Sequence, residues 1–147
     1  MKVFNSYGSK ERLFEMMKRV NNLNEQVLPP EKKTEIINKF IAFVKPKLDI
    51  KDMPEIVLSD DETEAQSMKS FGKYTPETNE LRVVIANRNL ADILRTFGHE
   101  LKHCEQREKG LLNQESNNTG SEEENEANAF AGVTMRDFGQ ENPLIFE

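Results

Sequence analysis

Two histidines four residues apart, with a glutamate directly after the first, carry the clearest chemistry in this sequence. They are His99, Glu100 and His103, in the run HELKH. On a helix, residues four apart lie on one side on successive turns, so both imidazoles can bind one metal ion at about 2.0–2.1 Å. Glu100 is displaced by about 100° around the helix, which puts its carboxylate beside the metal. We therefore expect a zinc site with Glu100 as general base, as in metallopeptidases.

The third metal ligand must come from elsewhere in the chain. The sequence contains only two histidines, and both lie in this run. A catalytic zinc site usually has three protein ligands and one open position, so we expect a carboxylate. The acidic stretch 122–131, EEENEANAFA, is the obvious source. On a helix, Glu123 and Glu124 both fall near the face marked by small and apolar residues, whereas Glu122 and Glu126 point away. Periodicity leaves the choice between Glu123 and Glu124 open.

HELKH followed by E-x-E-A-N-x-F-A resembles the zincin metallopeptidases that use a glutamate ligand, most closely the small ImmA/IrrE-like metallopeptidases. The resemblance covers residues 55–131 and is strongest over 97–103 and 124–131. It implies that Glu124, after a spacer of 20 residues, binds zinc. It also implies that Asn128 orients a ligand histidine without binding the metal itself. A zincin-like fold and a peptide or protein substrate follow from the same resemblance.

Simpler interpretations of these residues exist. Ser121 and Glu124 have the spacing of a capping box at a helix start, where acidic residues are also favourable. The histidines share their side of the helix with Asp92 and Thr96, so they can be two solvated residues on a polar face. A metal-binding but proteolytically silent module that recognises a protein partner is the alternative function. A third alternative is a helical adaptor in which HELKH is accidental and zinc does not bind.

Other residues have weaker claims to a role in the site. Tyr74 is the best candidate for stabilising the transition state, because it ends a strand just before a hairpin. The strand over 81–86 precedes the site helix, and it is either an edge strand that binds an extended substrate or an ordinary core strand. Cys104 lies on the apolar stripe of the site helix and is expected in the core. The weaker candidates for transition-state stabilisation are Arg82, Arg88 and Arg95.

The elements that must position these residues can be read from periodicity, caps and turns. We expect an α+β, zincin-like fold with N-terminal helices, a small antiparallel sheet, an active-site helix and a following ligand-bearing helix. One domain spans 1–147, with a helical part over 1–50 and a catalytic core over 55–138. The expected helices cover 9–21, 30–45, 60–68 (with a Ser59/Glu62 capping box), 89–109 ended by Gly110, and 121–138 ended by Gly139, and the expected strands cover 55–58, 71–74 and 81–86.

Composition limits the partners. The 147 residues carry a net charge of −6, which counts against a phosphate backbone as the main partner, so no nucleic acid is expected. A single cysteine excludes an intrachain disulfide and fits a reducing compartment. No run reaches the length of a membrane span or a signal peptide. We expect a soluble protein without a membrane partner, located in the cytoplasm. That is the host cytoplasm if a phage encodes the chain, since the opening segment 9–21 resembles segments of phage proteins.

Overall fold

The computed structural model describes residues 2–4, 28–111 and 121–146. The helix expected over 9–21 lies outside these residues. The elements follow in the order β1 (Lys2–Phe4), α2 (Pro30–Val44), the 3₁₀ turn η1 (Lys45–Lys47), β2 (Glu55–Ser59), α3 (Glu62–Met68), β3 (Gly72–Thr75), β4 (Glu80–Val84), α4 (Leu90–Glu108), α5 (Glu122–Glu141) and the 3₁₀ turn η2 (Pro143–Phe146). The α+β class is confirmed.

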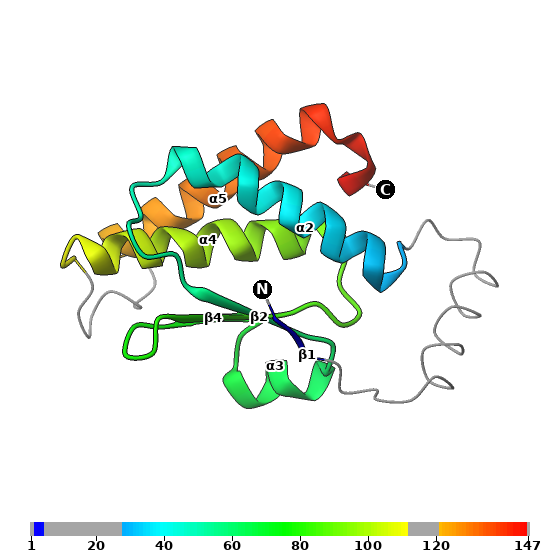
Figure 1. Cartoon of the computed structure of the whole chain (residues 1–147), viewed down its shortest axis with the longest axis horizontal. Coiled ribbons are helices and arrows are strands. Elements are labelled where there is room, and N and C mark those ends of the chain that lie inside the picture. Colours follow the sequence, from blue (N-terminus) through cyan, green and yellow to red (C-terminus); the bar gives the residue numbers. More distant parts are fainter. Residues whose placement is uncertain (1, 5–27, 112–120, 147) are drawn as a thin grey trace.

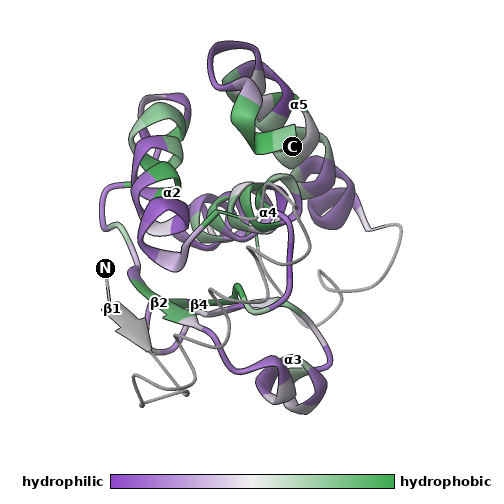
Figure 2. Ribbon diagram, turned by 90° about the vertical axis from the view of Figure 1, so that its right-hand side faces the viewer, coloured by the Kyte–Doolittle hydropathy of each residue, from purple (hydrophilic) through white to green (hydrophobic). Residues whose placement is uncertain are grey.

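The long helices α2, α4 and α5 lie on one side of the sheet, and the short helix α3 lies on the other (Figure 1). Helix α4 is the middle layer, because it contacts β3 and β4 on one side and α2 and α5 on the other. Strand β2 is strongly apolar, whereas α3 is largely polar and has no buried residue (Figure 2). Among the helices of the described residues, none has the length and hydrophobicity needed to cross a membrane.

The sheet is mixed, so the expectation of an antiparallel sheet is wrong. Its order is β1-β2-β4-β3. Strand β2 pairs in parallel with both β1 and β4, and only β3 and β4 form the expected antiparallel hairpin. After β2, the chain passes through α3 and returns along β3, and the hairpin then brings β4 in beside β2. Local sequence patterns predict each strand. The placement of β4 between β2 and β3 depends instead on how the chain runs from one strand to the next.

Helix α4 begins and ends as its sequence predicts. The side chain of Asn89 accepts a hydrogen bond from the backbone N–H of Asp92 (2.9 Å), which is an N-cap. After the helix, Gly110 has a φ of 72°, in the left-handed region that glycine adopts readily. The N–H of Leu111 then donates to the carbonyl of Gln106 (2.9 Å), which closes a Schellman motif. Both ends of the helix that carries HELKH are therefore defined by local hydrogen bonds.

Helix α3 starts later than expected. The expected capping box joins Ser59 and Glu62, but the N-cap is Asp61, whose carboxylate accepts from the N–H of Thr63 (3.0 Å). Ser59 is the last residue of β2 and is still paired with β4. Its hydroxyl donates to the carboxylate of Glu64. Strand pairing keeps Ser59 out of the helix, and the next acidic residues provide the cap.

Helix α5 continues past Gly139 to Glu141, so the expected stop at Gly139 is wrong. A Cβ at this position would collide with the ring of Phe146, so the glycine lets η2 pack against α5. The last helical residue is Glu141, and Asn142 is the C-cap directly before Pro143. A residue before proline is disfavoured in the helical conformation. Gly139 therefore serves packing, and Pro143 ends the helix.

The buried hydrophobic residues form one cluster between α4, the sheet and the other long helices. The rings of Phe40 on α2 and Phe138 on α5 meet edge to face, with centroids 5.3 Å apart. The expected apolar stripe of α4 is buried, including Cys104. This stripe holds α4 against the sheet and α2, which fixes the rotation of the helix and hence the direction of its histidines. Its members are Leu90, Leu94, Phe97, Leu101 and Cys104.

Candidate metal centre

His99 and His103 lie on successive turns of α4 and face the same point. Their Nε2 atoms are 3.0 Å apart, and the two rings meet edge to face. The side chains are 18% and 7% exposed respectively. The histidines are therefore not two solvated residues on an open polar face, because α5 packs across this part of α4. The spacing of four residues therefore places both imidazoles on one side of α4, as the sequence predicts.

Glu124 on the first turn of α5 completes the cluster. One carboxylate oxygen lies 3.0 Å from His99 Nε2 and the other lies 3.1 Å from His103 Nε2. The helix cap is present as well, since the N–H of Glu124 donates to Ser121 Oγ (3.1 Å). Only the backbone of Glu124 takes part in that bond, so its side chain is available to the histidines. Among the described residues, Glu124 and not Glu123 belongs to the group that could hold a metal ion.

The donor set fits a zinc ion. The three ligand atoms lie within 4.8 Å of one another. Tetrahedral bonds of about 2.0–2.1 Å would separate neighbouring ligand atoms by about 3.3 Å, close to the distances around this triangle. Burial, followed by the nearby His103, lowers the pKa of His99, although Glu124 partly opposes the shift. A lowered pKa favours the neutral imidazole, which is the form that binds metal.

Asn128 lies one turn beyond Glu124 on α5. Its side chain hydrogen-bonds His99, and this contact raises the pKa of the imidazole, although burial still sets the net direction. The structure therefore brings together His99, His103, Glu124 and Asn128, four of the residues that the motif and the resemblance single out. A polar partner on a ligand histidine restricts the orientation of its ring.

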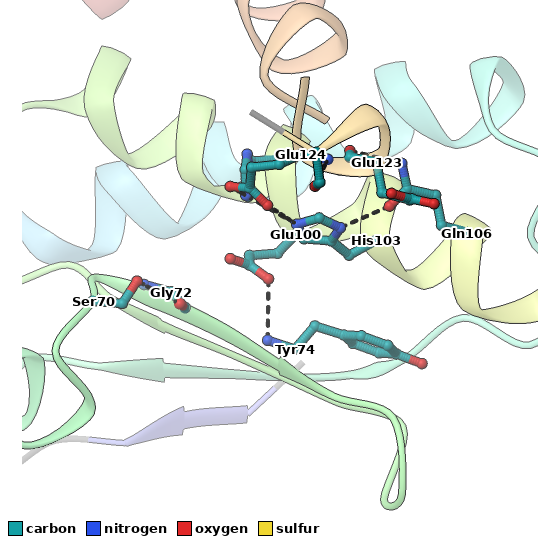
Figure 3. A network of polar contacts seen from close by, with 10 residues as sticks. Ser70, Gly72, Tyr74, Glu100, His103, Gln106, Glu123 and Glu124 are labelled. Carbon is teal, nitrogen blue, oxygen red and sulfur yellow. Dashed lines mark hydrogen bonds and ion pairs between the residues drawn. The ribbon is translucent and has the colours of Figure 1, made fainter. Parts of the chain in front are cut away.

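Glu100 lies beside this cluster and is buried. One of its carboxylate oxygens accepts a hydrogen bond from the backbone N–H of Tyr74 (3.1 Å; Figure 3). Burial raises the pKa of Glu100 to about 7, with His103 and the Tyr74 N–H acting in the opposite direction. A pKa near the working pH suits a group that must both accept and release a proton.

The hydroxyl of Tyr74 is not brought to the cluster. It donates to Asn79 Oδ1 (2.8 Å), and the ring points away from the Glu100 carboxylate (Figure 3). Burial raises the pKa of Tyr74 above its ordinary value. The contribution of Tyr74 to the site is its backbone N–H, which a sequence motif cannot reveal.

The three arginines are also engaged elsewhere. Arg82 pairs with Glu64 (2.6 Å), and Arg95 pairs with Asp92 (3.4 Å). Arg88 donates to the hydroxyl of Thr96 and to the carbonyl of Val84, and burial lowers its pKa to about 10. The hydrogen bonds and ion pairs of these three arginines therefore lead away from His99, His103 and Glu124.

Strand β3, not β4, forms the edge of the sheet nearest the cluster. The strand over 81–86, weighed above as an edge or a core strand, is an inner strand paired on both sides. Val84 donates its N–H to the carbonyl of Phe71 (2.8 Å). Hydrogen-bonded and non-hydrogen-bonded pairs alternate along antiparallel strands, so Gly72 and Tyr74 direct their backbone N–H and C=O groups to the open edge. Glu100 accepts the N–H of Tyr74, and the hydroxyl of Ser70 bonds the C=O (2.8 Å) and the N–H (3.3 Å) of Gly72.

Gln106 is a site residue that the sequence analysis missed. Its side chain contacts Nδ1 of His103 (2.8 Å) and also the first turns of α5. The available signal was its position three residues after His103, on the same side of the helix.

Comparison with known proteins gives no match to this chain among protein families, curated proteins or solved structures.

Proposed function

We propose that this chain is a zinc-dependent metallopeptidase of zincin-like fold that hydrolyses a peptide or protein substrate. The observation that carries the proposal is the convergence of His99, His103 and Glu124 beside the buried carboxylate of Glu100. A module that only binds metal has no need of a proton-transferring group with a pKa near 7 next to the ligands.

The proposed roles follow from the chemistry of each side chain. His99, His103 and Glu124 would hold the zinc, which supplies polarisation of the substrate carbonyl and activation of a water molecule when bound. Glu100 takes the proton from the attacking water and delivers it to the leaving amine. The N–H of Tyr74 holds the Glu100 carboxylate in place. Burial of Glu100 makes it a stronger proton acceptor than an exposed glutamate.

The open edge of β3 is the proposed binding place for the substrate backbone. Gly72 and Tyr74 direct their backbone groups outward there, and an extended peptide can pair with such groups by strand addition. It would take the place of the Ser70 hydroxyl, which bonds both the C=O (2.8 Å) and the N–H (3.3 Å) of Gly72. Glu100 borders the same edge through its bond to Tyr74. We expect a narrow substrate range or a need for activation, because a broadly active peptidase would damage the proteins around it.

Zinc content, measured by mass spectrometry on purified protein, tests the metal site. We expect about one zinc per chain in the wild type, lost in Glu124→Ala and kept in the matched Glu123→Ala, since three protein ligands are needed for tight binding. If the wild type takes up no zinc after reconstitution at neutral pH, the proposed function is wrong.

Peptide cleavage tests the chemistry. The zinc-loaded protein is incubated with a mixed-sequence peptide library, and Glu100→Gln serves as the inactive control. We expect cleavage by the wild type to exceed that of Glu100→Gln by at least about 10²-fold, the lower end for loss of a proton-transferring group. Zinc binding with equal, background cleavage by both proteins would favour the silent zinc-binding module instead.

A further inference from the structure

Gln106 on α4 carries an amide that is almost completely buried, with 1% of the residue exposed. Burying an amide is unfavourable unless its donors and acceptor are hydrogen-bonded. Both ends of this side chain are satisfied by partners on two helices: Nδ1 of His103 (2.8 Å), the Glu123 carbonyl (2.9 Å) and the Glu126 carboxylate (3.0 Å).

The partners determine which way the amide faces. The Glu123 carbonyl and the Glu126 carboxylate accept from Gln106, so its NH₂ group faces them. Its oxygen then faces His103. Since an amide oxygen only accepts, Nδ1–H of His103 is the donor in this contact.

This arrangement has a direct consequence for the metal site. A neutral His103 that is protonated at Nδ1 has its lone pair on Nε2. That atom faces His99 Nε2 (3.0 Å) and the Glu124 carboxylate (3.1 Å). The Glu124 carboxylate also only accepts, so without metal it favours a proton on Nε2 and competes with Gln106. The bond to Gln106 favours the tautomer that can bind a metal through the clustered nitrogen, and a bound metal would replace the proton between Nε2 and Glu124.

The same amide connects the two helices that supply the ligands. Its NH₂ group holds the Glu123 carbonyl, directly before Glu124 on the first turn of α5. Figure 3 shows Gln106 between His103 and this turn. His103 from α4 and Glu124 from α5 thus share one buried anchor.

We infer that Gln106 is a positioning residue for the metal centre, which favours the Nδ1–H tautomer of His103 and sets the place of Glu124 relative to it. The inference rests on the proposed function in one respect, namely that the cluster binds zinc. Its structural part, the preference for a proton on Nδ1, can be measured without metal once the competing Glu124 carboxylate is removed.

The first test is the tautomer of His103 by ¹⁵N NMR of metal-free Glu124→Ala protein above pH 8, because this substitution removes the carboxylate that competes for a proton on Nε2. The sequence has only two histidines, so the imidazole signals can be assigned with and without Gln106→Met in this background. We expect the Nδ1–H form of His103 when Gln106 is present and a mixture of tautomers in Gln106→Met. A predominant Nε2–H form of His103 with Gln106 present overturns the inference.

The second test is zinc affinity, measured by competition with a chromophoric chelator. We expect Gln106→Met to weaken binding by about 10–100-fold, the usual effect of removing a partner of a ligand histidine. The control is Thr134→Val, which removes a buried hydroxyl on α5 that bonds Phe130 (2.7 Å) and contacts neither histidine. It is expected to leave the zinc affinity unchanged.

A rescue variant separates positioning from packing. Gln106→Glu keeps an acceptor for His103 but loses the donor to the Glu123 carbonyl. Combining it with Glu126→Gln supplies a donor to the new carboxylate and avoids two adjacent carboxylates. We expect this double variant to keep the Nδ1–H form in the Glu124→Ala background and, with Glu124 present, to bind zinc more tightly than Gln106→Met.

Three further results would contradict the inference: zinc affinity of Gln106→Met within twofold of the wild type, a retained Nδ1–H form after Gln106→Met in the Glu124→Ala background, or loss of this form in the folded double variant in that background. Zinc binding by the wild type is measured first, so a failure of the proposed function is seen separately, before any variant of Gln106 is compared.

Discussion

At the residue scale, the position of Glu100 depends on a glycine in the neighbouring strand. Gly72 faces α4, and a Cβ at this position would overlap the methyl group of Thr96 and lie 3.2 Å from Cγ of Glu100. The close approach of β3 to α4 is what lets the N–H of Tyr74 reach the Glu100 carboxylate. A side chain at position 72 would separate the strand from the helix.

We therefore predict that Gly72→Ala lowers peptidase activity far more than it lowers zinc content. Overpacking of this kind costs about 1–3 kcal/mol of stability and shifts the backbone locally. His99, His103 and Glu124 lie on the two helices and are expected to keep the metal. Comparison of zinc content, melting temperature and cleavage rate checks this prediction, which is wrong if activity stays at the wild-type level.

Gly132→Ala is the matched control for the previous substitution. Gly132 lies within α5, and a Cβ there would meet no atom within 4 Å. Alanine is favoured over glycine inside a helix by about 0.5–1 kcal/mol. The control is expected to raise the melting temperature and to leave zinc content and activity unchanged.

At the scale of elements, the end of α4 holds the segment that leads from α2 to β2. The carboxylate of Glu105 accepts from the N–H of Asp49 (2.8 Å) and from Lys102 Nζ (2.7 Å). Burial acts to raise the pKa of Glu105, but these hydrogen bonds and the charges of Lys102 and Lys109 outweigh it, so the pKa lies below its ordinary value. The ionised form is therefore the one that stabilises the fold.

This lowered pKa predicts a pH-dependent contribution to stability. An unfolded glutamate titrates near pH 4.3, so the contribution of Glu105 is fully present above about pH 5 and is lost as the pH falls through its lower folded value. We expect Glu105→Gln to cost about 1–3 kcal/mol at pH 7 and progressively less towards pH 3. Urea unfolding of both proteins between pH 3 and 8 measures this difference.

Glu35→Gln provides the comparison for this pH series. The pKa of Glu35 is also lowered, first by the charge of Lys32, but Glu35 and its lysine partners lie on the exposed side of α2. Solvent screens such pairs, so a much weaker pH-dependent difference is expected. If the loss of unfolding free energy depends equally on pH for the two substitutions, burial of Glu105 does not strengthen its contribution to stability.

Several elements could be predicted because their signals are local. Asn89 and Gly110 bound α4 through hydrogen bonds within a few residues of each end. Pro30 starts α2, as expected for a first helical turn. The stop at Gly139 and the capping box at Ser59 failed because contacts from η2 and β4 override the local preference at those positions. The mixed pairing of the sheet depends on the order in which distant strands meet.

At the scale of the whole molecule, the site draws on three elements that are separate in the sequence. HELKH could be predicted because a spacing of four residues is enough to align His99 and His103 on any helix. Choosing Glu124 over Glu123 required the resemblance or the packing of α5. The anchoring role of Gln106 could not be predicted, because its partners Glu123 and Glu126 arrive only when α5 lies across α4.

The proposed zinc ligands lie on two helices, α4 and α5, so we predict that zinc binding stabilises the whole fold. A ligand at about 100 times its dissociation constant adds about 2.7 kcal/mol when it binds the native state alone. For a chain of this size, that corresponds to a rise in melting temperature of about 5–10 °C. Chelator treatment is expected to reverse the rise in the wild type and to have no effect on Glu124→Ala. An unchanged wild-type melting temperature would mean that zinc does not link α4 to α5.

The open edge of β3 also affects how copies of the protein behave together in concentrated solution. Unpaired backbone groups on an edge strand can pair with another copy and start aggregation. Strand β3 has only four residues, with the exposed Lys73 among them. The hydroxyl of Ser70 bonds both backbone groups of Gly72, and Glu100 covers the N–H of Tyr74. Gln in place of Glu100 still offers an oxygen to that N–H, whereas Ala uncovers it. Glu100→Ala is therefore expected to associate at concentrations where Glu100→Gln remains monomeric.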